Sequence, residues 1–130
     1  MAVSRFDKMP PVGAAMTPFP YFVEESDPAE VVLGLMTEHA IRHVPVLRQG
    51  RVVGIVSARA PDVVVPDPYV VEITTPLDDV VATMSQRRIG SAVVVKKGKL
   101  AGILSVTDVC RVLAEVLLER FPASGGNDAA

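Results

Sequence analysis

The stretch GILSVTDV, residues 102–109, decides the fold because it joins an apolar strand to the start of a helix. The apolar run ends at Ser105, and a threonine and an aspartate then precede apolar residues at helical spacing. An earlier stretch, GIVSARAP at 54–61, begins in the same way and ends differently. The chain therefore holds two versions of one strand, and only the second continues into Thr107-Asp108.

A repeat underlies this similarity. Residues 16–57 align with residues 64–105 without a gap at a shift of 48, and 14 of the 42 aligned positions are identical. Self-similarity at a fixed period indicates a structural unit that is too small to bury its apolar face alone. We therefore expect two copies of one unit, packed on each other.

Each copy predicts the same order of elements, β-α-β-β, and the second copy adds a final helix. The first helix is expected to begin with Pro28 or Pro76 as its first residue, after an N-cap in Ser26-Asp27 or Thr74-Thr75. Two strands that are apolar on both faces follow, joined by the basic tips RQGR and KKGK. Such strands are typical of sheets covered on both sides, and the tips are expected to be solvated.

The copies differ at their ends. The second predicts an amphipathic helix from Asp108 to about Arg120. Its apolar residues, expected to point inward, are Val109, Val112, Leu113, Val116 and Leu117. In the first copy the prolines of SARAPDVVVPDP forbid a long helix, so a connector with at most one helical turn is expected.

These patterns give a complete division of the chain. The expected parts are an N-terminal arm (1–11), a first repeat (12–60), a connector (61–63), a second repeat (64–120) and a disordered tail (121–130).

Composition excludes several classes of protein. The chain has 130 residues, 49% of them apolar and 22% charged, which is typical of a globular protein. The net charge of −2 gives no support for binding to nucleic acid or an anionic membrane. No apolar run is long enough to span a bilayer, and the N-terminus lacks a signal core. The chain has a single cysteine, Cys110, which excludes an internal disulfide. Its side chain is expected to pack in the protein interior. We expect a cytoplasmic location.

The layout resembles that of the CBS domain, and the tandem resembles the pair of such domains called a Bateman module. The matching pieces are AMTPFPYFVEESDPAEVVLGLM, IRHVPVL, GRVVGIVS and GKLAGILSVTDV, and the resemblance covers roughly residues 12–118. The resemblance implies an α/β (α+β) fold of two pseudo-symmetric β-α-β-β-α repeats packed through their sheets. It also implies a regulatory module that binds an adenosyl ligand, with no enzyme activity and no required cofactor.

The family's functional segment resembles Gly-apolar-apolar-Ser/Thr-x-x-Asp, and GILSVTD matches it fully. A helix N-terminus attracts phosphate, and a carboxylate can accept both hydroxyl hydrogens of a ribose. The residues alone favour a simpler alternative, in which Asp108 only caps the helix. The resemblance shifts the expectation toward a site for AMP, ADP, ATP or S-adenosylmethionine between the repeats.

The resemblance assigns residues to this site. From the second repeat they are Ile103, Ser105, Thr107 and Asp108, and from the first they are Met16, Thr17, Tyr21 and Ile41, with Gly90 on the rim. A weaker, pseudo-symmetric site would use Ser57, Arg59, Tyr69 and Ile89, where Ala60 replaces the aspartate. Both tyrosines leave two alternatives open, stacking on a purine or filling the pocket.

Other polar residues give weaker evidence of a ligand site. His43 lies where a rim residue would fall, and without acidic or cysteine neighbours it predicts a strand-end residue better than a ligand. His39 is expected to face solvent. No catalytic or metal-binding arrangement is readable from the spacing.

Two functions remain after this step. One is a ligand-sensing module that signals occupancy to an unknown protein partner and forms a homodimer through its apolar helix faces. Those faces are Val32, Leu35 and Met36, and Val112, Leu113 and Leu117. The other is a dimeric interaction scaffold with degenerate, ligand-free pockets.

Overall fold

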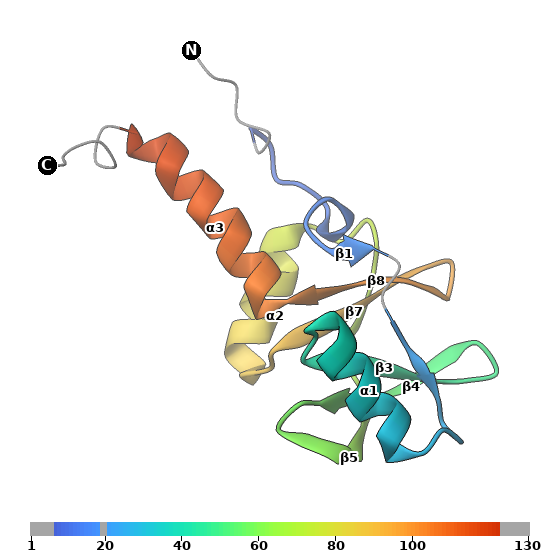
Figure 1. Cartoon of the computed structure of the whole chain (residues 1–130). Helices are drawn as coiled ribbons and strands as arrows, with labels where there is room; N and C mark the ends of the chain where they lie inside the picture. The colour runs from blue at the N-terminus through green and yellow to red at the C-terminus, as the bar shows by residue number, and fades with distance from the viewer. Residues whose placement is uncertain (1–6, 19–20, 123–130) are drawn as a thin grey trace, which may run out of the picture.

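The structure is a computed structural model, and it describes residues 7–18 and 21–122. It has two four-stranded sheets, ordered β1-β8-β7-β6 and β2-β3-β4-β5 (Figure 1). The elements in chain order are η1 (Val12–Ala14), β1 (Thr17–Pro18), β2 (Val23–Glu24), α1 (Ala29–His39), β3 (His43–Arg48), β4 (Arg51–Ser57), β5 (Ala60–Pro66), β6 (Val70–Glu72), α2 (Leu77–Arg87), β7 (Ser91–Lys96), β8 (Lys99–Ser105) and α3 (Val106–Arg120). The tail that was expected to be disordered lies outside the described residues from residue 123 onward.

The predicted mixed fold with two pseudo-symmetric repeats is confirmed. In each repeat a short strand pairs in parallel with the strand after the helix, and that strand forms an antiparallel hairpin with the next. The registers also repeat, since Val23 pairs with Val46 and Val71 pairs with Val94. Both hairpins turn at a residue followed by glycine, Gln49-Gly50 and Lys97-Gly98, with all four φ angles positive. Two successive positive φ angles match the twist of a tight hairpin.

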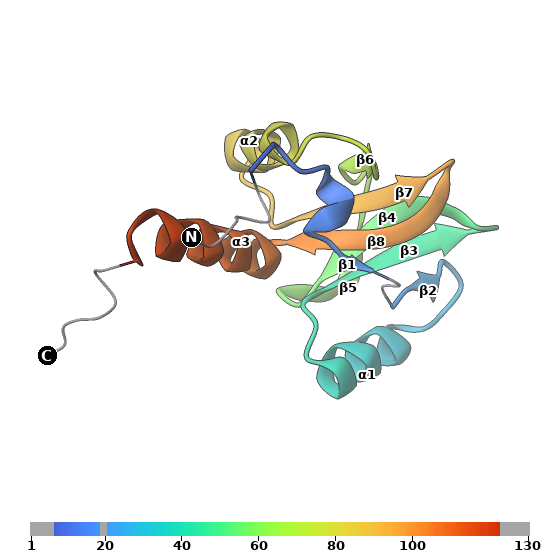
Figure 2. The ribbon, with the colours of Figure 1, turned by 90° about the horizontal axis from the view of Figure 1, so that it is seen from above.

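Each repeat has a core between its helix and its sheet. The first contains Val32 and Met36 of α1 with Val44, Val46 and Val56 of the sheet. The second contains Val80 and Met84 of α2 with Leu104 of β8, among others. The two sheets lie between α1 and α2, and β4 contacts β8 across the pair (Figure 2). This arrangement explains why the central strands are apolar on both faces.

The starting segment of each repeat completes the sheet of the other repeat. β1, near the start of the first repeat, pairs with β8 of the second, and β5, which leads into the second, pairs with β4 of the first. The pairs are equivalent at a shift of 48, because Pro18 pairs with Gly102 and Pro66 pairs with Gly54. From here on, the arm means residues 7–18, which join the described end of the expected arm to the start of the first repeat. Its residues Val12 and Ala15 likewise lie in the core of the second repeat. The repeats are thus linked by exchanged segments, which the local sequence does not reveal.

Both glycines at these crossings are needed for close packing. A Cβ at Gly102 would lie 2.7 Å from the carbonyl oxygen of Thr17, and one at Gly54 would lie 3.0 Å from that of Val65. Real Cβ atoms rarely approach backbone oxygen so closely, so a side chain here would push the crossing segment away. The identical glycines of the repeat therefore have a packing role.

The connector and the first-turn caps differ from the sequence predictions. Instead of a connector with a helical turn, Ala60–Pro66 forms β5, whose run of valines suits a strand better than a turn. Pro28 and Pro76 are the N-caps of α1 and α2 rather than their first helical residues, and neither helix has a side-chain cap. Asp27 instead accepts a hydrogen bond from the backbone N–H of Glu24.

Helix α3 begins earlier than expected and is only partly covered. It runs from Val106 and projects away from the two sheets (Figure 1). Val109 and Val112 pack against the core of the second repeat, as expected. Three residues expected to point inward are exposed, namely Leu113, Val116 and Leu117, because no described element lies over the outer part of this helix. Cys110 is also exposed, so its predicted packing role is wrong.

Two searches of the described residues bear on other classes of function. No helix in the described ranges is long and apolar enough to cross a membrane. Within the same ranges, no group of three or more His, Cys, Asp or Glu side chains is arranged to hold a metal ion.

Candidate functional site

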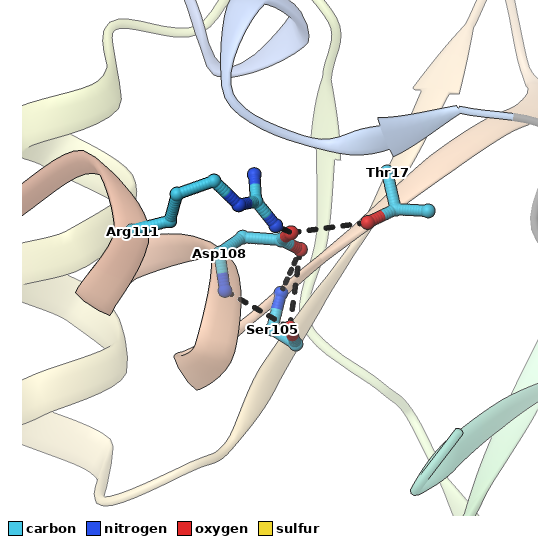
Figure 3. Close-up of polar contacts among 4 residues, drawn as sticks. All are labelled: Thr17, Ser105, Asp108 and Arg111. Atoms are coloured by element: carbon cyan, nitrogen blue, oxygen red, sulfur yellow. Dashed lines mark hydrogen bonds and ion pairs between the residues drawn. The ribbon is translucent and has the colours of Figure 1, made fainter. Parts of the chain in front are cut away.

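Asp108 lies in the first turn of α3 and is 1% exposed. Its Oδ2 accepts hydrogen bonds from the backbone N–H of Ser105 at 2.9 Å and from the Ser105 hydroxyl at 3.1 Å. Its Oδ1 accepts one from the Thr17 hydroxyl at 3.0 Å and forms an ion pair with Arg111 (Figure 3). The carboxylate is thus buried and surrounded by donors, as a buried charge requires.

The local sequence explains this position. Ser105 is the N-cap of α3 and Asp108 is the third helical residue, so the two form a capping box. The backbone N–H of Asp108 donates to the Ser105 hydroxyl at 3.2 Å, which completes the reciprocal pair. The prediction that the helix begins at Asp108 is therefore wrong by two residues, since it begins at Val106. The positive end of the helix further stabilises the carboxylate.

The N-terminal arm brings two predicted residues to the same corner. Thr17 lies opposite Ile103 in the pairing of β1 with β8, and its hydroxyl reaches Asp108. Met16 packs against the core of the second repeat and lies close to Gly102. Five of the eight residues predicted for the main site therefore share one corner, namely Met16, Thr17, Ile103, Ser105 and Asp108. We call this group the Asp108 corner.

The remaining three residues lie around or away from this corner. Thr107 is next to Asp108 and is exposed. Ile41 packs against the core of the first repeat. Tyr21 is 44% exposed and stacks on His39, with ring centroids 3.7 Å apart and an interplanar angle of 11°. His39 is thereby partly covered, which differs from the solvent-facing position expected for it.

The pseudo-symmetric set has no comparable centre. Ser57 ends β4 and pairs with Ala60 across a tight turn, and Arg59 lies exposed in that turn. Tyr69 is half-buried, and the Arg87 guanidinium carbon lies 5.0 Å from its ring centroid. Ile89 packs against the core of the second repeat. The four residues are therefore spread over separate contacts.

His43 lies where the two repeats meet. A Cβ at Gly90 would lie 3.2 Å from two ring atoms of His43, so the imidazole lies against the second repeat. Burial and, to a lesser degree, the charge of Arg42 hold the pKa of His43 below its ordinary value. The imidazole is therefore neutral at pH 7. His43 and Gly90 are therefore neighbours across the junction of the repeats.

Arg111 also contacts the Asp108 carboxylate, and the sequence reasoning missed it. Its guanidinium pairs with Asp108 one turn earlier on the same helix. The i, i+3 spacing of an acidic and a basic residue was a readable signal for this pair.

Comparison with known proteins identifies the family to which this architecture belongs. The family model of the CBS domain matches twice, at residues 12–60 and 61–115. The chain belongs to the CBS domain family. The two matches follow each other directly, so the protein is a tandem CBS pair. No curated protein matches the chain.

Solved structures of CBS pairs resemble the whole arrangement. A Vibrio cholerae protein assigned to acetoin utilization is 26% identical, with a TM-score of 0.77, over 87% of this chain and 97% of that one. CBSX2 in complex with AMP is 26% identical, with a TM-score of 0.74, over 82% and 98%. The CBS domain of a bacterial CNNM/CorC family Mg²⁺ transporter in complex with ATP is 25% identical, with a TM-score of 0.72, over 82% and 88%.

Proposed function

We propose that this CBS pair is a regulatory module that binds an adenosyl compound such as AMP, ADP or ATP at the Asp108 corner. The observation that carries the proposal is the Asp108 carboxylate, which lies at a helix N-terminus and contacts both the arm and the second repeat. Two similar CBS pairs hold AMP and ATP in their structures, which supports this ligand class.

The corner has the chemistry that such a ligand needs. Asp108 would accept the ribose hydroxyls in place of the Thr17 hydroxyl, which is the donor that comes from the arm. The exposed Thr107 hydroxyl and the helix N-terminus suit a phosphate. Met16 and Ile103 would give the adenine apolar contacts, with Tyr21 and Ile41 farther out.

Binding at this place would change how the arm is held. Thr17 and Asp108 are 91 residues apart in sequence, and their hydrogen bond joins β1 to α3. A ligand that takes the carboxylate would favour a state in which this bond is broken, in proportion to its differential affinity for the two states. Such a change would signal occupancy to a protein partner. A cytoplasmic, non-enzymatic role is part of the same proposal.

A thermal-shift panel with AMP, ADP, ATP, NAD and S-adenosylmethionine tests the proposal. A ligand present at about 100 times its dissociation constant stabilises the protein by ~2.7 kcal/mol. Asp108→Asn keeps one acceptor for the capping box but loses the charge, and Thr107→Ala changes an exposed side chain; both are expected to weaken binding. Ser57→Ala, in the first repeat at the position equivalent to Ser105, is the control and is expected to bind normally.

The outcomes are distinct. No shift with any compound would contradict the sensing function. A shift that survives both substitutions would place the ligand elsewhere, and the weaker set of Ser57, Arg59, Tyr69 and Ile89 would be tested next.

A dimeric interaction scaffold is the second candidate. It is favoured by the exposed apolar residues of α3, since Leu113, Leu117 and Leu118 are 52%, 47% and 64% exposed. The face expected on α1 does not support it, because Val32 and Met36 are buried in the core. We propose a homodimer through α3, whether or not a ligand binds.

Sedimentation tests the dimer. The wild-type chain is expected to sediment as a dimer, and Leu113→Glu with Leu117→Glu is expected to give a folded monomer. Val31→Glu with Leu33→Glu, two exposed positions on α1, is the control. A wild-type monomer at micromolar concentration contradicts the homodimer.

A further inference from the structure

An open groove of about 900 Å³ lies at the hairpin end of the two sheets, between the turns β3–β4 and β7–β8. Its twelve lining residues form six pairs related by the shift of 48, so the groove lies on the pseudo-two-fold axis. The pairs are Phe22 with Val70, Leu47 with Val95, Gln49 with Lys97, Gly50 with Gly98, Arg51 with Lys99, and Val52 with Leu100.

The floor of this groove is apolar and partly open to solvent. It is formed by Phe22, Leu47 and Val52 of the first repeat and by their three apolar equivalents in the second. Phe22 is 47% exposed and Val70 is 40% exposed, although both belong to large apolar types. Leu47 and Val95 are buried below them. The groove thus offers apolar surface that described parts of this chain leave uncovered.

The rim of the groove is cationic. Arg51, Lys97 and Lys99 line it, and no acidic residue does. Within the described ranges, none of these three forms an ion pair or a side-chain hydrogen bond. The neighbouring Arg48 differs, because its guanidinium is paired with Glu25, with one N–O distance of 2.7 Å. Three positive charges that no described residue pairs therefore collect at one place on a chain whose net charge is −2.

The groove is separate from the Asp108 corner. It meets β8 at Lys99 and Leu100, at the start of that strand, whereas the corner uses Ile103 and Ser105 near its end, and Asp108 lies beyond Ser105 in α3. The five steps from Leu100 to Ser105 along the strand span ~17 Å. A ligand in the groove would therefore not touch Asp108.

We infer that this groove binds a small amphipathic carboxylate, with its apolar body on the floor and its carboxylate at the Arg51-Lys97-Lys99 rim. A neutral apolar ligand would leave the rim charges without a partner, and an inorganic anion would leave the floor uncovered. A carboxylate joined to an alkyl chain matches both parts, since charge-assisted hydrogen bonds fix its head and apolar burial holds its tail. The volume is within the range of small-molecule sites.

Calorimetric titration with decanoate below its micelle concentration tests this inference. Saturable binding with one decanoate per chain is expected. Lys97→Glu with Lys99→Glu is expected to weaken it at least tenfold, because the rim becomes repulsive. Phe22→Ser is expected to weaken it severalfold through loss of apolar floor. Far-ultraviolet circular dichroism checks that each variant is folded.

Matched controls separate the groove from general charge and apolar effects. Lys8→Glu with Arg120→Glu changes the net charge by the same amount at exposed positions outside the groove, and Val31→Ser removes an exposed apolar residue from α1. Both controls are expected to bind decanoate like the wild type. Asp108→Asn is also expected to bind normally, so this test is independent of the adenosyl proposal.

Several results would overturn the inference. They are absence of saturable binding, equal weakening by the controls, or loss of decanoate binding when AMP is present or Asp108 is changed. Binding only to anionic lipid vesicles or only to an acidic peptide, with none to decanoate, would assign the groove to a different occupant.

Discussion

The segments that follow β8 and β4 both start at a serine, and they then form different structures. Ser105 caps a helix of 15 residues, whereas Ser57 leads through a tight turn into the antiparallel strand β5. At the shift of 48, the Asp108 carboxylate and two of its partners are replaced, since Thr17, Asp108 and Arg111 correspond to Val65, Ala60 and Val63. The carboxylate, its donor from the exchanged segment and its counter-charge are therefore absent together.

The change of sequence after the shared serine redirects the chain, while the hairpin before it stays the same. After Ser57 a helix would place Pro61 in its first turns, where the ring disfavours continuation, and the valines at 63–65 favour a strand. After Ser105 the capping box and the Asp108–Arg111 pair both favour a helix. The pseudo-symmetry thus holds for the scaffold and is broken at the candidate site.

The largest expected effect is at the glycine crossings. Gly102→Ala places a Cβ 2.7 Å from the Thr17 carbonyl oxygen, while Gly54→Ala places one 3.0 Å from that of Val65. We expect a loss of ~2–3 kcal/mol of unfolding free energy for Gly102→Ala and ~1–2 kcal/mol for Gly54→Ala. Urea unfolding measures both. Equal losses would show that the two crossings are equally tight.

The loss of unfolding free energy on substitution should differ between the two serines, because only Ser105 caps a helix. Ser105→Ala removes the N-cap hydroxyl of α3 and is expected to cost ~1–2 kcal/mol, whereas Ser57→Ala is expected to cost less than ~0.5 kcal/mol. Urea unfolding of the two variants under identical conditions checks this. A similar cost for both would mean that the capping box contributes little.

The ion pair at the corner is expected to matter less. Arg111 is half exposed, so Arg111→Ala is expected to cost only ~0.5–1 kcal/mol although its partner is buried. The loss should shrink in 1 M salt, because screening weakens the pair in the wild type. The comparison is Arg120→Ala on the same helix, which should be neutral at both salt concentrations.

The smallest effect is a pH dependence at the junction of the repeats. The pKa of His43 is lowered by burial, so the unfolded chain binds its proton more readily. The contribution of His43 to the free energy of unfolding is fully present above about pH 6.5, the ordinary pKa of histidine. It is lost as the pH falls through the lower pKa of the folded state. Thermal melts from pH 7.5 to pH 5 should show a smaller decline for His43→Gln than for the wild type. Identical declines would exclude His43 as the cause.

Much of the fold could be predicted because the same sequence pattern occurs in both repeats. The 48-residue shift and the apolar runs predicted both hairpins, the two first helices and their pseudo-symmetry. The exposure of Leu113, Val116 and Leu117 could not be predicted, because helical spacing indicates an apolar face but not whether a neighbour covers it. The stacking of Tyr21 on His39 was likewise missed, because it depends on how the segment before α1 lies against the end of that helix.

The sequence by itself determined the two repeats, a cap at the start of the last helix, and the loss of the aspartate at Ala60, because these depend on spacing along the chain. The structure moved the N-cap from Asp108 to Ser105. Only the tertiary structure decided that Thr17, near the start of the first repeat, reaches Asp108 in the second. It also decided that residues 60–66 become a strand of the first sheet rather than a connector. Strand pairing over long distances depends on the whole sheet, so no local pattern specifies which segment completes which repeat.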